Sequence, residues 1–132
     1  MHNVKFDREC LFCNKKKQNI IYSTKFVYVV RDSFPVTKYH SLIIPHRHIP
    51  DFFDLNKDEL KELSETLKKE RQSLLSLDKK ITAFNVGVNA GKDAGQSVMH
   101  CHIHLIPRRK GDIENPRGGV RGVIPSKQKY VK

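Results

Sequence analysis

Three histidines alternate with apolar residues within residues 98–107, and they are the strongest chemical signal in the sequence. Such alternation is typical of a β-strand with one buried face, and it would place His100, His102 and His104 on the same side. At about 3.3 Å of rise per residue, the outer two lie roughly 13 Å apart and neighbours roughly 6.6 Å apart. The three imidazoles therefore cannot all bind one metal ion or one phosphorus atom, and we expect them to have separate roles.

Two assignments of chemical roles are sensible for these histidines. In the first, His102 attacks a phosphate as a nucleophile while a neighbouring histidine donates a hydrogen bond. A free imidazole has a pKa of about 6.5 and is largely neutral at pH 7, which suits this task. In the second, His102 and His104 bind a catalytic metal ion with a distant third ligand and a water molecule. The spacing alone leaves both possibilities open.

Two of the three cysteines form a C-x-x-C motif, Cys10 and Cys13. In a reducing compartment such a pair indicates metal ligands or redox thiols rather than a disulfide. A thioredoxin-like redox motif would open a helix, and residues 14–19 show no helical pattern. The pair supplies half of a zinc site and requires two further ligands.

The elements that must position these side chains can be predicted from periodicity. Leucines recur at spacings of three, four and seven across residues 56–77, which predicts a helix with Asn56 as its N-cap. Segments rich in β-branched and aromatic residues predict strands over residues 20–30, 39–45, 82–89 and 98–107. We therefore expect a single α+β domain with an antiparallel sheet and one main helix. The apolar side of the histidine segment should face the core, and it consists of Met99, Cys101, Ile103 and Leu105.

The chain of 132 residues carries a formal net charge of +11, and much of this charge lies at one end. Residues 107–132 hold eight basic and two acidic side chains, a net +6 directly after the histidine segment. Excess Lys and Arg can indicate a nucleic acid, an acidic membrane or a phosphorylated small molecule as partner. Nucleic-acid binding is disfavoured because Tyr130 is the only aromatic residue of this tail on which a base could stack.

Hydropathy argues against a membrane-spanning segment, and we expect no membrane partner. The longest apolar stretch, residues 26–30, is far shorter than the roughly 20 residues that a membrane helix needs. The first ten residues lack the apolar segment of a secretory signal peptide. The expectation is a cytoplasmic protein with one domain over residues 1–132.

The segment GQSVMHCHIHLIPR, residues 95–108, resembles the signature of the histidine triad (HIT) superfamily of nucleotide hydrolases and transferases, His-φ-His-φ-His-φ-φ with φ apolar. The similarity extends upstream to the segment HSLIIPHRHI at residues 40–49 and covers roughly residues 10–108. It implies a HIT-like fold with a core of about residues 8–108 and a basic, loop-like tail of about residues 109–132. Members commonly form homodimers in which the sheet continues across both subunits.

The resemblance implies a mechanism in which His102 attacks the α-phosphate of a nucleotide. Water then releases a nucleoside monophosphate from the nucleotidyl-histidine, while His104 hydrogen-bonds the phosphate and His40 supports the nucleophile. The implied substrates are AMP-X compounds, dinucleoside polyphosphates such as diadenosine tetraphosphate first and adenosine phosphoramidates second, arriving in some cases with Mg²⁺. Transfer to a non-water acceptor, or a non-catalytic nucleotide- or nucleic-acid-binding module, stays open as an alternative.

The resemblance also implies ligands around the substrate and the metal. Asp32 matches a residue that accepts hydrogen bonds from the ribose, and Leu11 and Phe12 match an apolar pair around the base. Members with the C-x-x-C motif complete a structural zinc site with two histidines, here His48 and His100. In this superfamily the C-terminal segment often crosses the dimer interface toward the partner's active site, and we hypothesise that two arginines of the basic tail there reach the outer phosphates or the leaving group. The remaining implied residues are Asn89, Gln96 and Ser97 near the phosphates, the zinc ligands Cys10 and Cys13, and the tail residues Arg117 and Arg121.

Overall fold

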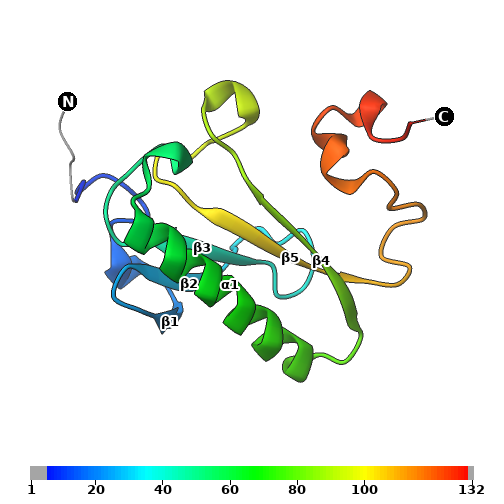
Figure 1. Cartoon of the computed structure of the whole chain (residues 1–132), viewed down its shortest axis with the longest axis horizontal. Helices are drawn as coiled ribbons and strands as arrows, with labels where there is room; N and C mark the ends of the chain where they lie inside the picture. Colours follow the sequence, from blue (N-terminus) through cyan, green and yellow to red (C-terminus); the bar gives the residue numbers. More distant parts are fainter. Residues whose placement is uncertain (1–5, 131–132) are drawn as a thin grey trace.

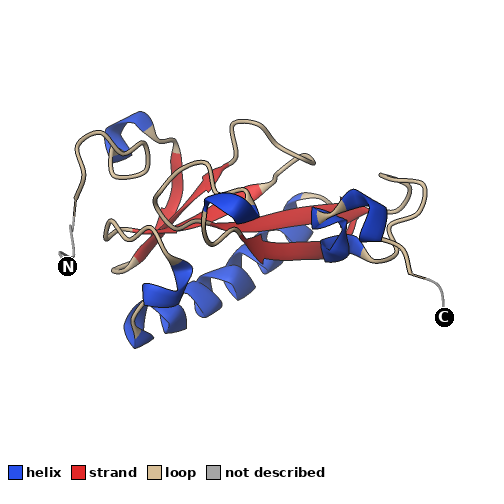
Figure 2. Cartoon of the chain, turned by 90° about the horizontal axis from the view of Figure 1, so that it is seen from above, coloured by secondary structure: helices blue, strands red, loops and turns tan. Residues whose placement is uncertain are grey.

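The protein is described by a computed structural model over residues 6–130, and its centre is one five-stranded antiparallel sheet. The spatial order of the strands is β1-β2-β3-β5-β4. A single long helix, α1 (Lys57–Leu77), crosses one face of the sheet, as Figures 1 and 2 show. This confirms the predicted α+β class. The strands are β1 (Ile20–Ser23), β2 (Val27–Arg31), β3 (Ser41–Pro45), β4 (Ile81–Val88) and β5 (Ile103–Arg109).

Short 3₁₀ helices lie in the connections and in the C-terminal segment, which is therefore not wholly loop-like. Within residues 6–130, no helix combines the length and the hydropathy of a membrane-spanning segment. The 3₁₀ helices are η1 (Lys15–Lys17), η2 (Phe52–Asp54), η3 (Lys92–Ala94), η4 (Gly119–Val123) and η5 (Pro125–Lys127).

The helix α1 begins where its capping residue predicts. The side chain of Asn56 accepts a hydrogen bond from the Glu59 backbone N–H, and the Glu59 carboxylate accepts one from the Asn56 N–H in return. This reciprocal capping box satisfies two backbone donors that the helix start would leave unpaired. Leu63 and Leu74 are buried on the inner face of α1, so the leucine spacing correctly identified the side that packs on the sheet.

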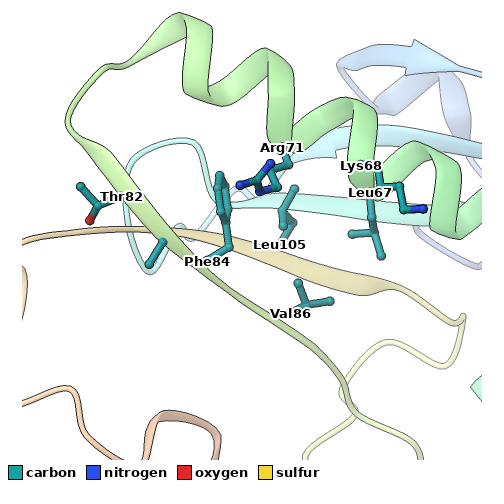
Figure 3. Close-up of a pocket in the computed structure, with 8 residues that line it drawn as sticks. Leu67, Lys68, Arg71, Thr82, Phe84, Val86 and Leu105 are labelled. Atoms are coloured by element: carbon teal, nitrogen blue, oxygen red, sulfur yellow. The ribbon is translucent and has the colours of Figure 1, made fainter.

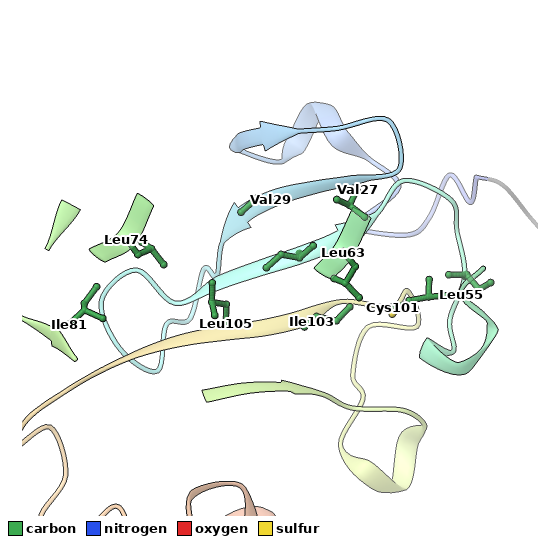
Figure 4. Close-up of a cluster of buried hydrophobic side chains, with 11 residues drawn as sticks. Val27, Val29, Leu55, Leu63, Leu74, Ile81, Cys101, Ile103 and Leu105 are labelled. Carbon is green, nitrogen blue, oxygen red and sulfur yellow. The ribbon is translucent and has the colours of Figure 1, made fainter. Parts of the chain in front are cut away.

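The core divides into two clusters, one on each face of the sheet. Between the sheet and α1 lies the larger cluster, which includes Val29, Ile43 and Ile103 and is drawn in Figure 4. On the opposite face, Phe12 packs against Tyr28 and a smaller group of aliphatic side chains. Strands β2 and β3 are thus buried on both faces, and they form the fixed centre of the domain.

The predicted strand over residues 20–30 is in fact two strands joined by a tight turn. The Thr24 N–H donates to the Val27 carbonyl over 2.8 Å, and the Val27 N–H donates to the Thr24 hydroxyl over 3.1 Å. This local side-chain bonding reverses the chain after β1. A continuous run of strand-forming residues concealed the turn.

The predicted strand over residues 98–107 begins only at Ile103. The Cys101 N–H donates to the Ile49 carbonyl over 2.7 Å, outside the ladder between β3 and β5. Met99 is 49% exposed, so its predicted place in the core is wrong, whereas Cys101, Ile103 and Leu105 are buried as expected. The three histidines therefore do not line one face of a regular strand.

Candidate functional site

Three histidines gather on the sheet face opposite α1. In β5, Ile103 and Leu105 pack toward the helix, so His104 between them faces the other side. His40 immediately precedes β3, which pairs with β5, and its ring centroid lies 5.1 Å from that of His104. His102 immediately precedes β5, with its ring centroid 5.3 Å from that of His104. The pairing of β3 with β5 thus gathers the histidines from two distant parts of the chain.

A chain of hydrogen bonds fixes the protons of two of these rings. The Val36 backbone N–H donates to His40 Nδ1 over 3.0 Å, so the proton of a neutral His40 must sit on Nε2. His40 Nε2 lies 2.9 Å from His104 Nδ1 and donates to it. His104 Nδ1 is then an acceptor, and the proton of His104 is on Nε2. The second nitrogen of His104 is thereby prepared to donate a hydrogen bond to a ligand.

His102 has the opposite arrangement to His104. Its Nδ1 lies 2.8 Å from the carbonyl oxygen of His100, which can only accept, so this nitrogen carries the proton. Its Nε2 therefore holds a lone pair. The Phe12 ring packs against His102 edge-on, with centroids 5.1 Å apart, and His102 is 8% exposed. A packed, oriented imidazole with a free lone pair has the properties of a nucleophile.

Burial keeps His40 and His104 neutral. Desolvation is the largest cause of the lowered pKa of His104, which falls to about 4, and nearby His102 and His40 lower it further. Desolvation also lowers the pKa of His40, against the opposing effect of Asp32. At pH 7 both rings are therefore uncharged, which agrees with the donor and acceptor roles described above.

Asp32 lies beside this chain, at the end of β2. One of its carboxylate oxygens accepts the Phe34 N–H over 2.8 Å, and the other is 3.5 Å from His40 Nε2. Asp32, His40 and His104 are close enough to share a metal ion. The tautomer opposes this, because His40 would have to bind through Nε2 while its Nδ1 is already a hydrogen-bond acceptor. That would require an imidazolate, so these contacts favour a hydrogen-bonding role over a second metal site.

A hollow of about 690 Å³ opens beside His40 and His104. Asn89, at the end of β4, also lines it. Polar residues such as Asn85 and Gln128 line the hollow together with the two histidines, and apolar residues make up much of the rest of the lining. A pocket of this size can hold a small organic molecule.

The glycine loop after β4 is held by Gln96. Its side-chain oxygen accepts the Gly91 N–H over 2.9 Å, and its nitrogen donates to the carbonyls of Pro50 and Val98 over 2.8 and 3.1 Å. These contacts fix the loop on the segment that precedes the histidines. Ser97 is exposed next to this buried amide. The predicted phosphate contacts of Gln96 and Ser97 stay predictions.

The two residues predicted to enclose the base have different environments. Phe12 is 5% exposed and belongs to the core cluster around Tyr28, whereas Leu11 is 51% exposed. The Tyr28 hydroxyl donates to the Phe12 carbonyl, which anchors this loop on β2. Phe12 thus packs against the His102 ring. Of the two residues, Leu11 is the one whose side chain is exposed and can contact a ligand.

A second cluster of side chains joins residues that are up to 90 positions apart in the sequence. Cys10 and His100 approach to 3.4 Å between Sγ and Nδ1, and Cys13 and His48 to 3.3 Å between the same atom types. His100 Nε2 lies 2.8 Å from the Pro45 carbonyl and donates to it, so His100 Nδ1 holds a lone pair that faces the cysteines. All four predicted ligands are brought together, with ligand atoms within 4.8 Å of one another.

The geometry of this cluster fits zinc. Tetrahedral zinc, with Zn–S of about 2.3 Å and Zn–N of about 2.0–2.1 Å, separates sulfur from nitrogen by about 3.5 Å and two nitrogens by about 3.3 Å. Three S–N distances in the cluster are 3.3, 3.4 and 3.6 Å, and the N–N distance is 3.2 Å. Burial raises the pKa of the Cys13 thiol to about 11, so a thiolate there needs a cation beside it. Cys10, Cys13, His48 and His100 could therefore hold a metal ion.

The basic tail does not bring its arginines to the His104 hollow. Neither Arg117 nor Arg121 lines it, and both guanidinium groups lie over the Tyr130 ring, 5.4 and 5.0 Å from its centroid. Within one chain these two charges therefore lie away from the hollow, and their predicted contact with a substrate in a partner subunit stays a prediction. Apolar tail residues that the charge pattern hid, among them Val120 and Val123, line the hollow instead. The concentration of glycines and apolar residues in residues 118–124 was the available signal.

Comparison with known proteins identifies the family of this domain. The HIT domain family matches residues 14–111. The nitrilase and fragile histidine triad fusion protein NitFhit of Caenorhabditis elegans is 40% identical over 100 residues, which are 76% of this chain and 22% of that protein. The asymmetrical bis(5'-nucleosyl)-tetraphosphatase of Schizosaccharomyces pombe is 37% identical over 94 residues, 71% of this chain and 51% of that protein. The chain thus spans about a fifth and about half of the lengths of these two relatives.

A solved structure of a zinc-bound protein shares the fold of this chain. The crystal structure of a zinc-bound histidine triad family protein from Mycobacterium smegmatis superposes with a TM-score of 0.72 at 28% identity, covering 79% of this chain and 78% of that one. The residues matched by the HIT domain family contain the histidine segment and all five strands, and Cys10 and Cys13 directly precede them. On these grounds the chain belongs to the HIT domain family.

Proposed function

We propose that this protein is a nucleotide hydrolase that cleaves AMP-X compounds through a nucleotidyl-histidine on His102. The substrates are dinucleoside polyphosphates, such as diadenosine tetraphosphate, or adenosine phosphoramidates. The observation that carries the proposal is the free Nε2 lone pair of His102, created by the hydrogen bond from Nδ1 to the His100 carbonyl. The names of the relatives support the hydrolase class, because one of them is a bis(5'-nucleosyl)-tetraphosphatase.

In the first step, His102 Nε2 forms a bond to the α-phosphorus of the substrate. The bond from phosphorus to the bridging oxygen or nitrogen breaks, and its electron pair leaves with that atom. His104 Nε2–H, aligned by His40, donates to a phosphate oxygen as negative charge concentrates there. His102 becomes a positively charged phosphoimidazolium, and its Nδ1–H stays bonded to the His100 carbonyl.

In the second step, water attacks phosphorus and the bond to His102 breaks. The imidazole recovers its neutral form with the lone pair on Nε2. Over the two steps, one water supplies a hydroxyl to phosphorus and a proton to the leaving group, and AMP is released. The covalent intermediate divides one difficult displacement into two easier ones.

The remaining predicted side chains would bind the nucleotide. Asp32 retains a carboxylate oxygen for the ribose hydroxyls, and Leu11 offers an exposed apolar side chain to the base. Asn89 lines the hollow next to His104, where the phosphates would lie. Association of Mg²⁺ with the substrate, and a cytoplasmic location, are further expectations of the proposal.

Zinc in this scheme is structural. Cys10, Cys13, His48 and His100 supply four ligands, which would complete a tetrahedron and leave no position for a reacting water. When bound, zinc would tie the N-terminal loop to the segment before β5. The His100 carbonyl, which orients His102, lies in that segment.

We further propose that the protein forms a homodimer through β4. This strand is at the edge of the sheet, and Val86 on it is half exposed. A hollow of about 360 Å³ between β4 and α1, lined by Leu67, Phe84 and Val86, continues this apolar surface (Figure 3). Exposed edge strands with apolar side chains readily pair with a second strand. Sedimentation of the wild type and Val86→Lys tests this, since the variant should be monomeric.

The hydrolase proposal is tested with the full chain, diadenosine tetraphosphate and adenosine 5'-phosphoramidate, with products separated by chromatography. Attack at the α-phosphate should give AMP with ATP from the first substrate, and AMP with ammonia from the second. The His102→Ala variant should form neither, whereas the matched Cys101→Ala variant should retain both reactions. ADP that forms only after addition of phosphate, or an ADP-sugar that forms only after addition of a sugar phosphate, would instead identify a transferase.

A further inference from the structure

The turn that leads into β3 carries His40 and contains an unusual backbone conformation. Residues 37–40 form this turn, which is closed by the hydrogen bond from the His40 N–H to the Thr37 carbonyl over 3.0 Å. Tyr39, at the third position, has a φ of +74° and is the one residue other than glycine with a positive φ within residues 6–130. A positive φ at the third position alone defines a type II turn, where glycine is usual because a side chain is strained there. The surrounding contacts must therefore hold Tyr39 in this conformation.

A relay of side chains that starts on α1 holds the carbonyl of Tyr39. The Ser41 hydroxyl donates to this carbonyl over 2.7 Å, and Arg31 donates to the Ser41 hydroxyl over 2.9 Å. Glu70 of α1, which is 4% exposed, accepts a hydrogen bond from the same Arg31 nitrogen over 3.1 Å. The Arg31 guanidinium also lies over the Tyr39 ring, 5.8 Å from its centroid. The Glu70–Arg31 ion pair thus supports both the backbone and the ring of Tyr39.

A second relay holds the preceding carbonyl, that of Lys38. The Arg109 guanidinium donates to this carbonyl over 3.1 Å. It also donates twice to one carboxylate oxygen of Asp78, the C-cap of α1, over 3.1 and 2.9 Å. Type I and type II turns differ by a rotation of the peptide between their second and third residues. That rotation would relieve Tyr39 but would turn the Lys38 carbonyl away from Arg109, so this hydrogen bond favours the strained form.

The held turn determines where the His40 ring lies. The backbone of His40 is fixed at both ends, because its N–H closes the turn and its carbonyl accepts the Asp32 N–H over 2.8 Å. From this position His40 Nε2 donates to His104 Nδ1 over 2.9 Å. Tyr39 is bonded directly to His40, so a change in its conformation would displace the ring from this contact. A displacement of about 1 Å within a catalytic arrangement can cost about 10²-fold in rate.

We propose that Arg31 and Arg109 are positioning residues, which hold the strained turn at Tyr39 so that His40 reaches His104. This rests on the proposed hydrolase function, since the effect on the rate passes through the N–H that His104 offers to the phosphate. Neither arginine is among the described residues that line the hollow, so neither touches a substrate bound there. The two relays matter because Tyr39 is strained, and they should matter less when that strain is removed.

The test cuts each relay separately in the full chain and measures kcat and KM for adenosine 5'-phosphoramidate. Arg109→Met removes the donor to the Lys38 carbonyl. Ser41→Ala removes the donor to the Tyr39 carbonyl and leaves the ion pair of the buried Glu70 intact, so that no buried charge loses its partner. Each variant should lower kcat about tenfold with little change in KM.

Two further variants separate positioning from general damage to the fold. In the Tyr39→Gly background, each loss should shrink to about twofold or less, because glycine adopts a positive φ without strain. Lys69→Met is the matched control, since Lys69 is a cation that ties α1 to the Tyr22 hydroxyl of β1, on the opposite side of β2 from β3. This control should keep the kcat of the wild type.

A second readout does not depend on turnover. In the ¹⁵N-labelled wild type, the His40 Nε2–H proton should give a slowly exchanging, downfield NMR signal, which is assigned by its absence from His40→Leu. The signal should be lost in Arg109→Met and in Ser41→Ala. It should return when either variant is combined with Tyr39→Gly, and Lys69→Met should retain it.

The outcomes separate the two proposals. If the wild type releases no AMP while both relay variants lose the signal, the hydrolase proposal fails and the anchoring of His40 stands. If the relay variants keep the signal, whatever their kcat, the positioning role is overturned. Losses that are as large in the Tyr39→Gly background, or an equal loss in Lys69→Met, would also overturn it, because strain at Tyr39 would then play no part.

Discussion

His100 and His102 are two residues apart in sequence, yet they present opposite ring nitrogens. His100 donates from Nε2 to the Pro45 carbonyl and turns the lone pair of Nδ1 toward the cysteines. His102 donates from Nδ1 to the His100 carbonyl and leaves Nε2 free. In each case a backbone carbonyl selects the tautomer. The role of each of these two histidines is therefore set by the carbonyl to which its N–H donates, rather than by its position in the motif.

The largest effect should follow from removal of the free lone pair. The His102→Ala substitution is expected to lower kcat by about 10⁴-fold, because no other group can form the covalent intermediate. Its zinc content and its thermal unfolding should match those of the wild type, since His102 is not a metal ligand. Steady-state kinetics on diadenosine tetraphosphate measure the rate. A loss smaller than tenfold would refute the role of His102.

Removal of zinc tests the role of His100 as a metal ligand. With free zinc at about 1,000 times Kd, binding to the folded state should add about 4 kcal/mol to the free energy of unfolding. Urea unfolding with and without chelator measures this difference, which should be absent in His100→Ala and in Cys10→Ala. Cys101→Ala keeps all four ligands and should respond to chelator as the wild type does. An equal response in Cys10→Ala would contradict the assigned ligand set.

The fold was predictable where the signal is local, and α1 is the example. Its capping residue Asn56 and the spacing of Leu63 and Leu74 are set within one segment. The start of β5 was not predictable in this way, because alternation of histidines with apolar residues imitates a strand. The bond from Cys101 to Ile49 and the metal cluster that includes His100, both long-range, override that alternation.

The same distinction applies to the candidate site. The spacing of the histidines predicted that His100 and His104 have separate roles. The assignment of His100 and His48 to the cysteine cluster required the family resemblance. The hydrogen bond from the Val36 backbone to His40 carries no sequence signal, because any residue but proline supplies an N–H. In the tail, the charge pattern favoured Arg117 and Arg121 as functional residues, whereas Val120 and Val123 line the hollow.

A smaller effect is expected at His40, which acts on the site through His104. His40→Leu removes the donor to His104 Nδ1 and should lower kcat by about 10- to 100-fold with little change in KM, as for other supporting groups. His40→Gln can offer an amide N–H and should recover part of the loss. If both variants were equally slow, a hydrogen-bonding role for His40 would be wrong and a purely packing role would explain the loss.

The smallest effect concerns pH. Because the pKa of His104 is lowered to about 4 from an unfolded value near 6.5, the unfolded chain takes up this proton first as the pH falls. The stability from a neutral His104 is complete above pH 6.5 and is lost as the pH falls toward 4, by on the order of 1 kcal/mol after solvent screening. Urea unfolding from pH 7.5 to 5 should show a steeper decline for the wild type than for His104→Gln. Parallel curves would contradict the buried, neutral state.

The central claim is that His102 Nε2 carries the nucleotide between the two steps. Mass spectrometry of enzyme quenched within milliseconds of mixing with diadenosine tetraphosphate tests it most directly. We predict an adduct of one AMP on the peptide that contains His102, stable at high pH and lost in acid, with none on His100 or His104. A burst of AMP with no adduct on His102, or an adduct on either of the other histidines, would contradict the account.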